Sequence, residues 1–189
     1  MEHLADGGSG GPVRDARFVA DVMLGRLARW LRALGYDTLY SRDASDARLL
    51  GIALREGRRL LTRDTGLARR ARATGLLIRA EDLDAQIREV MTACGLVARV
   101  PLSRCLECNG TLTRRHPEEV RERVPPYTLA TQREFWTCAG CGRVFWAGSH
   151  APGILSRLRP YLAPPPSPLD DGRGIDSKGA TRRIKGTDD

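Results

Sequence analysis

Between residues 17 and 100 the chain alternates four times between a short apolar run and a stretch whose apolar residues recur at helical spacing. The four short runs have the length of buried strands and lie at residues 18–20, 38–40, 59–62 and 76–78. Strand and helix repeated in this way predict a parallel sheet wrapped by helices. The predicted fold class of this part is therefore α/β.

The helical stretches carry their own boundary signals. A stripe of leucines predicts a first helix over residues 24–34, which a glycine then ends. The second helix begins at Ser45 or Asp46, because either residue suits an N-cap. The third is short, at residues 67–73, and the fourth begins at Asp82. The order of elements is therefore β-α-β-α-β-α-β-α.

Acidic residues follow the ends of the predicted strands. In an open parallel sheet, sites form beyond the carboxyl ends of the strands. We therefore expect several of these carboxylates to converge at one edge of the sheet. In chain order the acids are Asp21, Asp43, Asp46, Asp64, Glu81 and Asp82.

Carboxylates gathered in a cleft repel one another, and the usual relief is a hard divalent cation bound through oxygen. Mg²⁺ or Mn²⁺ held in this way can activate a water and stabilise the departing oxygen of a phosphodiester. This chemistry is typical of a nuclease. The alternative is that Asp46, Asp64 and Asp82 only cap helices, a role that aspartate also favours. The sequence leaves both interpretations open.

Other catalytic schemes have little support in the sequence. The chain has three histidines, and none lies in the α/β part, so a Ser-His-Asp arrangement has no histidine there. Neither a G-x-x-x-x-G-K-[ST] loop nor a G-x-G-x-x-G turn follows a predicted strand. These absences argue against an enzyme that uses nucleoside triphosphates or dinucleotides.

Two C-x-x-C pairs lie in the second half of the chain, Cys105 with Cys108 and Cys138 with Cys141. Glycine follows each pair closely, as metal-binding turns require. Four thiolates at this spacing predict a tetrahedral, structural Zn²⁺ site. Two disulfides or a redox-active C-x-x-C are the alternatives. The remaining cysteine, Cys94, is predicted to be a buried apolar residue.

Composition suggests four segments. Glycine-rich residues 1–16 are expected to be a disordered leader, and the proline-rich and charged residues 163–189 a disordered tail. Between them, residues 17–100 form the α/β domain and residues 101–162 a zinc-ribbon domain. The leader has no secretory signal and no apolar run is long enough for a membrane helix, so we expect a cytoplasmic protein without a membrane partner.

The formal net charge of +8 favours a polyanionic partner such as nucleic acid. On the first helix, Arg26, Arg29 and Arg32 recur at helical spacing. Such a row is usually a solvated face, although it lies well for contact with a phosphate. In the ribbon, Arg133 and Arg143 lie beside the aromatic pairs at 135–136 and 145–146. Arginine and aromatic rings together can bind single-stranded RNA, but the rings also suit the core of a small hairpin.

Several separate motifs, in order along the chain, resemble one known family. They lie at residues 18–37, 61–64, 103–110, 123–127 and 135–146. Together they resemble the PIN-like RNase domain with a carboxyl-terminal zinc ribbon, the family named after the C-terminal domain of the Mut-seven mutator exonuclease. The resemblance spans residues 17–162.

This resemblance implies a PIN-like parallel sheet with helices on both faces, a divalent-metal ribonuclease centre and RNA as the substrate. Carried over by position, Asp21 matches the acid that ends the first strand, and Asp64 the acid of a Thr-Arg-Asp element. Asp46 matches the acid before the paired leucines of the second helix. Glu81 and Asp82 are both candidates for a fourth acid.

The leading hypothesis is therefore a metal-dependent ribonuclease, in which the acids hold Mg²⁺ or Mn²⁺ and Zn²⁺ shapes the ribbon. A second hypothesis is a noncatalytic RNA-binding protein whose acids only cap helices. A third is a redox protein that uses a C-x-x-C pair. The sequence leaves open which RNA is cut, whether cleavage is endo or exo, and the oligomeric state.

Overall fold

The computed structural model of the protein describes residues 16–96, 101–148 and 151–162. Apart from Ala16, the predicted leader and tail lie outside these residues. No helix in the described ranges is long and apolar enough to cross a membrane.

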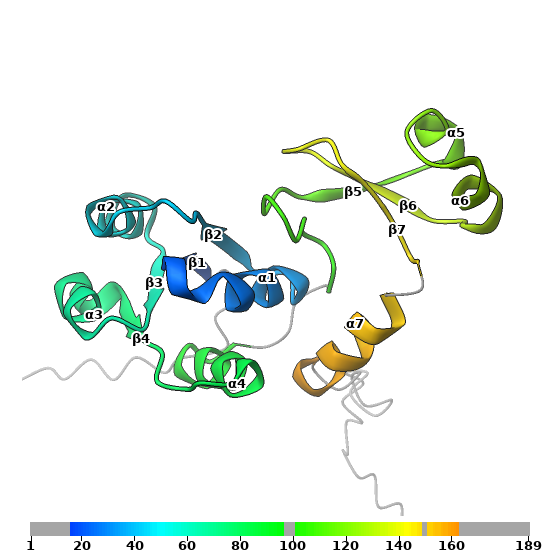
Figure 1. Ribbon diagram of the computed structural model, residues 1–189. Coiled ribbons are helices and arrows are strands. Elements are labelled where there is room, and N and C mark those ends of the chain that lie inside the picture. The colour runs from blue at the N-terminus through cyan, green and yellow to red at the C-terminus, as the bar shows by residue number, and fades with distance from the viewer. Residues whose placement is uncertain (1–15, 97–100, 149–150, 163–189) are drawn as a thin grey trace, which may run out of the picture.

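The α/β part is built on a sheet of four parallel strands (Figure 1). Their spatial order is β2-β1-β3-β4, so the first strand lies inside the sheet and the second forms one edge. The ladders are in regular parallel register, with Val19 opposite both Leu39 and Leu60. The strands are β1 (Arg17–Ala20), β2 (Asp37–Tyr40), β3 (Arg59–Thr62) and β4 (Gly75–Leu77).

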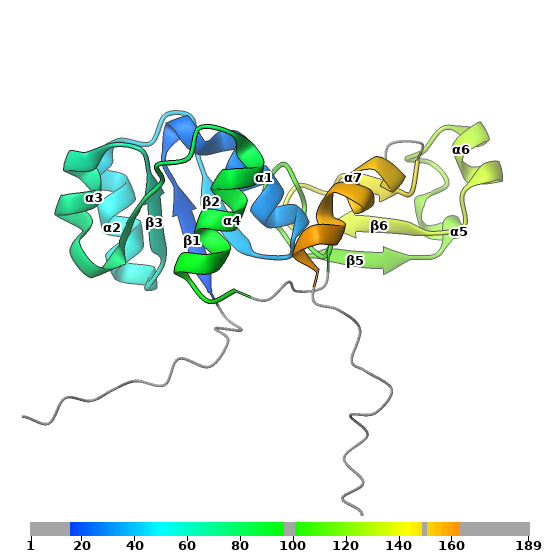
Figure 2. The same cartoon turned by 90° about the horizontal axis from the view of Figure 1, so that it is seen from below.

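Helices cover both faces of this sheet, as Figures 1 and 2 show. On one face, Phe18 and Ala20 pack in a core cluster with residues of α1 and α4. On the other, Val19 and Leu60 pack with residues of α2 and α3. The helices are α1 (Gly25–Ala33), α2 (Asp46–Glu56), α3 (Thr65–Ala71) and α4 (Leu83–Ala93). The predicted PIN-like α/β arrangement is confirmed.

Local chemistry explains where these helices begin and end. Ser45 caps α2 by accepting a hydrogen bond from the Arg48 amide, and Gly57 ends it with a left-handed backbone at φ 60°. Helix α3 begins two residues earlier than expected, because Asp64 is its cap. It closes through a 3₁₀ turn, η2 (Arg72–Thr74). A 3₁₀ turn, η1 (Val22–Leu24), also precedes α1.

The second part is a three-stranded antiparallel sheet in the order β5-β6-β7. Its strands are β5 (Leu112–Arg115), β6 (Phe135–Cys138) and β7 (Val144–Trp146), and the predicted β6–β7 hairpin is confirmed. Two short helices that the sequence pattern did not suggest, α5 (Pro117–Val120) and α6 (Pro126–Thr131), connect β5 to β6. Phe135 is fully buried with Val120 and Val124 in a small core. Together with the four cysteines, this fits a zinc ribbon.

After the ribbon, the chain returns to the α/β part through α7 (Ala151–Leu158) and the 3₁₀ turn η3 (Arg159–Tyr161) (Figure 2). Leu158 and Tyr161 are buried in the same core cluster as residues of α1 and α4. The Arg157 guanidinium pairs with Asp84 and lies 5.0 Å from the centre of the Trp30 ring. The last part of the predicted ribbon segment therefore packs in the α/β core.

Candidate functional site

Asp21 lies directly after β1, at the carboxyl edge of the sheet, and is only 5% exposed to solvent. Its Oδ1 accepts a hydrogen bond of 2.6 Å from the Val22 amide, as the cap of η1. Its Oδ2 accepts one of 2.6 Å from the Thr62 hydroxyl, at the end of β3. Both carboxylate oxygens are thus held in place, one by its own chain and one by a neighbouring strand.

Thr62 also links Asp21 to Asp64. The Asp64 amide donates to the Thr62 hydroxyl oxygen at 3.0 Å, while that hydroxyl donates to Asp21. Asp64 Oδ1 accepts from the Leu67 amide at 2.6 Å and so caps α3. Within the described ranges, no residue donates a hydrogen bond to Asp64 Oδ2. The structure therefore brings Asp21 and Asp64 to adjacent strand ends.

Asp46 has a different environment. It is the first residue of α2 and does not cap the helix, because Ser45 fills that role. Its carboxylate forms an ion pair with the Arg70 guanidinium of α3, and its side chain is half exposed. The negative charge of Asp46 is therefore balanced by an arginine in this conformation.

The last two candidate acids lie beyond β4. Asp82 caps α4, because its Oδ1 accepts a hydrogen bond of 2.9 Å from the Ala85 amide. Glu81 is exposed, and among the described residues only its backbone carbonyl is engaged, by the Gln86 side chain at 3.3 Å. The geometry therefore gives Asp82 a helix-capping role and leaves the Glu81 carboxylate in solvent.

The acids supply carboxylate oxygens, which are the ligands that Mg²⁺ and Mn²⁺ prefer. Among the described residues, the only group of three or more potential metal ligands whose donor atoms all lie within 4.8 Å is a group of cysteines. Asp21, Asp46 and Asp64 therefore suit such a cation by chemistry but do not close around one point here. Asp46 would have to leave Arg70 to join the other two.

That cysteine group comprises Cys105, Cys108, Cys138 and Cys141, so the predicted tetrad is brought together and can hold a metal ion such as zinc. The Sγ atoms of Cys105 and Cys141 are 3.8 Å apart, and those of Cys108 and Cys138 are 3.3 Å apart. Each C-x-x-C pair contributes one buried and one exposed cysteine. The two turns thus face each other, as in a closed structural site.

The thiols of the tetrad differ in acidity. Burial, together with the neighbouring thiols, raises the pKa of Cys108 to about 12. Burial would also raise the pKa of Cys138, but hydrogen bonds to its sulfur, including those from the Cys141 and Gly140 amides, lower it to about 7. Amides directed at sulfur are what a thiolate that binds a metal requires.

Gly110 allows the two turns to approach closely. A Cβ atom at this position would lie 2.7 Å from the Cys138 Sγ and 3.0 Å from the Gly140 amide nitrogen. We expect Gly110→Ala to weaken zinc binding by about 10- to 100-fold, the usual loss when a residue supporting the ligands is disturbed. Competition with a chromogenic zinc chelator measures this change.

Gly140→Ala is the graded control for this substitution. Its Cβ would lie 3.2 Å from the Cys108 Sγ, a closer contact than is usual but one that a small shift relieves. Zinc affinity should therefore fall less than in Gly110→Ala. Equal affinities of Gly110→Ala and the unchanged protein would contradict the role assigned to Gly110.

A buried polar network holds the first cysteine turn against the α/β part. The Arg32 guanidinium donates to the backbone carbonyls of Thr38, Leu106 and Glu107 at 2.8, 3.0 and 2.8 Å. Burial lowers the pKa of Arg32, and the negative charge of the nearby cysteine sulfurs opposes this. Arg32 is only 4% exposed, so the prediction of a solvated arginine face is wrong at this position.

Asn109 completes the same network. Its side chain accepts from the Thr38 amide at 2.9 Å and donates to the Asp37 carboxylate at 2.7 Å. Burial would raise the pKa of Asp37, but hydrogen bonds from Arg58 and Asn109 outweigh it and hold the pKa below its usual value. The sequence pattern did not indicate this structural role for Arg32 or Asn109, although Asn109 directly follows Cys108 of the tetrad.

The four arginines predicted to contact nucleic acid are all exposed. Arg26 and Arg29 lie on α1, where Arg29 forms a 2.6 Å ion pair with Glu107 of the first cysteine turn. Arg143 lies 3.8 Å from the same carboxylate. Arg133 lines a separate small groove beside β5. The structure therefore brings Arg29 and Arg143 together around Glu107 and leaves Arg133 apart.

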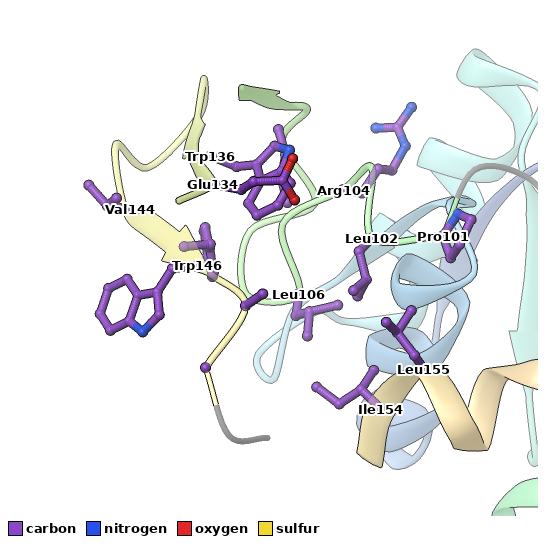
Figure 3. A pocket seen from close by; sticks show the side chains of 14 residues that line it. Pro101, Leu102, Arg104, Leu106, Glu134, Trp136, Val144, Trp146, Ile154 and Leu155 are labelled. Carbon is purple, nitrogen blue, oxygen red and sulfur yellow. The ribbon is translucent and has the colours of Figure 1, made fainter. Parts of the chain in front are cut away.

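The aromatic residues of the ribbon divide between the two roles considered for them. Phe135 is buried in the ribbon core, whereas Trp136 and Trp146 line an apolar groove of about 560 Å³ (Figure 3). Ile154 and Leu155 of α7 line its opposite side. Trp146 is 38% exposed, so its ring is accessible to a ligand. The interpretation that the rings fill the ribbon core therefore holds for Phe135. It does not hold for Trp146, which is exposed, and Trp136 is only partly buried.

Comparison with known families gives a match over residues 16–158 to the family described as the Mut7-C RNAse domain. Among curated proteins, the chain is similar to the human exonuclease mut-7 homolog, with 43% identity over 49 residues. That similarity covers 25% of this chain and 6% of the human protein, so the chain spans a small part of that relative's length. The family match includes both the acidic sheet edge and the cysteine tetrad.

Proposed function

The chain belongs to the Mut7-C RNAse domain family, and from this premise we propose that it is a metal-dependent ribonuclease that hydrolyses RNA phosphodiester bonds. The observation that carries the proposal is the pairing of Asp21 and Asp64 at adjacent strand ends through Thr62. Open α/β sheets form their binding and catalytic sites beyond the carboxyl ends of the strands. Family membership indicates the reaction class. The carboxylates are oxygen ligands that suit Mg²⁺ or Mn²⁺, and they lie at the edge of the sheet where such sites form.

In this proposal, Asp21 and Asp64 are the principal ligands of Mg²⁺ or Mn²⁺, and Asp46 joins them when it separates from Arg70. A cation bound there supplies an activated water and neutralises the charge of the departing oxygen. The protein's own part is to preorganise the carboxylates. The Val22 amide and the Thr62 hydroxyl fix the orientation of Asp21, so its carboxylate need not reorganise when substrate binds.

Glu81 is the better candidate for a fourth acid. The Asp82 carboxylate already accepts a hydrogen bond from the first turn of α4, whereas that of Glu81 is not engaged by any described residue. Capping alone does not exclude Asp82, because Asp64 caps α3 in the same way. The Glu81 carboxylate can approach a cation without losing a hydrogen bond to a described residue, so we assign Glu81 the auxiliary role at the acidic edge.

The second metal in the proposal is a structural Zn²⁺ on Cys105, Cys108, Cys138 and Cys141. Four thiolates complete a tetrahedral shell, so such an ion has no open position for substrate. Its function is to shape the ribbon and to hold the first cysteine turn where Arg32 and Asn109 contact it. The exposed Arg143 and the accessible tryptophans then assist RNA binding.

A noncatalytic RNA-binding protein is the second candidate. The ion pair between Asp46 and Arg70 favours it, as do the capping hydrogen bonds of Asp64 and Asp82. These are the contacts expected of acids that only support the fold. The two candidates differ in one property, which is whether RNA is cut when a divalent cation is present.

The test is incubation of the purified protein with end-labelled RNA, without added divalent metal and then with Mg²⁺ or Mn²⁺. We expect cleavage only with the added cation, since the carboxylates alone would repel the phosphate. The products are resolved by gel electrophoresis. Salt-sensitive binding of RNA, with no cleavage under either cation, rejects the ribonuclease and supports the binding protein.

A further inference from the structure

A basic groove of about 570 Å³ lies between the start of α1, the end of β2 and the first cysteine turn. We use this name for the surface formed by Arg26, Arg29, Tyr40, Arg42, Leu106 and Glu107. Met23 of η1 also lines the groove, and η1 begins directly after Asp21. One end of the basic groove therefore lies close along the chain to Asp21, on which the proposed cleavage site is centred.

The aromatic wall of the groove is fixed in place. The Tyr40 hydroxyl donates to the Val22 carbonyl at 3.1 Å, across the first turn that follows Asp21. The Tyr40 ring lies against Gly25, where a Cβ atom would come within 2.7 Å of it. A held aromatic ring beside exposed arginines offers stacking and charge together, which is how single-stranded nucleic acid is bound.

Two arginines of the groove have no anionic partner among the described residues. Arg26 and Arg42 are exposed, and neither forms an ion pair or a hydrogen bond through its side chain there. Arg32, the other arginine that lines the groove without an acid partner, is buried and bound to three backbone carbonyls. Arg26 and Arg42 are therefore the cations that remain available to a ligand at this end.

At the other end, one acid stands between arginines of the two parts of the protein. Glu107 Oε1 lies 2.6 Å from Arg29 of α1, and its Oε2 lies 3.8 Å from Arg143 of the second cysteine turn. All three side chains are about half exposed, so a soluble anion can reach the same two guanidinium groups. The Glu107 carboxylate thus occupies a position that suits a phosphate.

From this geometry we propose that the basic groove binds the backbone of a single-stranded RNA that leads to Asp21, and that Glu107 competes with one of its phosphates for Arg29 and Arg143. The inference rests on the proposed function, because it gives the substrate of that same site. Arg26 and Arg42 contact further phosphates, and Tyr40 stacks on a base. Glu107 thereby weakens RNA binding.

A single strand fits these features better than a duplex. In a duplex the bases are stacked inside the helix, so a lone tyrosine in a groove has no base face to contact. An unpaired strand can turn a base onto Tyr40 while its phosphates follow the arginines. Duplex binding would use the same cations but would not depend on the ring.

The test measures the Kd for a labelled oligouridylate by fluorescence anisotropy, without added divalent metal and over a range of salt concentrations. Each phosphate contact to a single strand contributes about 0.7 to the slope of log Kd against log salt. Replacing both Arg26 and Arg42 with alanine should raise the Kd about tenfold and lower that slope by about 1.4. Glu107→Gln should lower the Kd about fivefold and steepen the slope by about 0.7.

Matched controls separate the groove from net charge. Glu122→Gln removes an exposed acid of the ribbon that lines neither the basic groove nor the apolar groove of the tryptophans. Arg55→Ala with Arg69→Ala removes two exposed arginines of α2 and α3, on the opposite face of the sheet from α1. Zinc content and melting temperature of every variant must match those of the unchanged protein, because Glu107 lies next to a cysteine ligand.

The inference is overturned by a Glu107→Gln variant that binds RNA no more tightly than Glu122→Gln, or by an arginine double variant that binds like its control. Tyr40→Leu removes the ring and should raise the Kd for the oligouridylate at least about fivefold while leaving duplex binding unchanged. Equal effects of this substitution on single-stranded and duplex RNA also overturn the inference. The proposed function fails separately. Groove-dependent binding without cleavage in Mg²⁺ or Mn²⁺ rejects the ribonuclease and leaves the groove, whereas cleavage with normal binding by the double variant rejects only the groove.

Discussion

Asp21→Asn is expected to abolish metal-dependent RNA cleavage, with a rate at least about 100-fold below that of the unchanged protein. Asparagine keeps one oxygen that can accept from the Val22 amide, and its NH₂ group can donate to the Thr62 hydroxyl, which now donates to Asp21. The substitution therefore removes the charge and leaves the local structure in place. Single-turnover cleavage of labelled RNA with saturating Mn²⁺ measures the loss.

Asp64→Asn should reduce cleavage to a similar extent, and it separates catalysis from folding more cleanly. Asparagine is as good an N-cap as aspartate, so the hydrogen bond from the Leu67 amide that begins α3 is retained. The matched control is Asp43→Asn, which removes an exposed acid just past β2 that has no proposed role. Undiminished cleavage by both Asp21→Asn and Asp64→Asn, at unchanged melting temperature, would rule out the assigned centre.

Removal of zinc is the second change with a large expected effect, and it should unfold the ribbon. Structural zinc sites of this ligand type contribute about 10 to 16 kcal/mol of apparent binding free energy, which is coupled to folding. The ribbon's own apolar core contains Val120, Val124 and Phe135 as its buried members. So small a core does not offset the conformational entropy of ordering the segment without a metal.

Cys108→Ser tests this expectation. The purified variant should contain much less than one zinc per chain, and the amide NMR signals of the ribbon should collapse toward random-coil positions. The signals of β1 and β3, which lie within the sheet, should remain dispersed. Cys94→Ala is the control, because Cys94 lies outside the tetrad and burial raises the pKa of its thiol, so it should keep full zinc content. Full zinc content with a folded ribbon in Cys108→Ser would contradict the structural role.

Much of the α/β part can be predicted from the sequence, because its elements depend on local signals. The apolar runs around Val19 and Leu60 are short and buried, and alternate residues of β1 face the two core clusters. Asp82 and Gly57 mark helix ends for reasons that involve only neighbouring residues. The cysteine tetrad is predictable for a related reason, since metal coordination leaves a fixed spacing in the chain.

The features that escaped prediction depend on contacts between residues far apart in the sequence. Arg32 has the spacing of a solvated helix face, and it is buried only because the carbonyls of Leu106 and Glu107 approach it. Whether Asp46 faces a cation or an arginine depends on the side chain of Arg70, one helix further along. Helical periodicity says nothing about such partners, so the sequence indicated which acids lie at the sheet edge but not their pairing.

Helix α7 was missed for a different reason. Its apolar residues Ile154, Leu155 and Leu158 have helical spacing, but the segment lies beyond the cysteines and was grouped with the ribbon. In the structure, Leu158 and Tyr161 complete the core formed by α1 and α4. The helical spacing was therefore present in the sequence, but the segment was grouped with the ribbon, whereas it packs against the α/β part.

The return of α7 makes the ribbon an insertion in the α/β unit, anchored at both of its ends. A fragment that stops near residue 100 would leave an unfilled apolar site where Leu158 belongs, and would also lose the partner of Asp84. Such a fragment is a poor choice for isolating the α/β part. A better deletion removes only the ribbon between the first cysteine turn and α7 and joins the ends with a short glycine-serine linker, so that both α7 and the carbonyls that hold Arg32 stay in the chain.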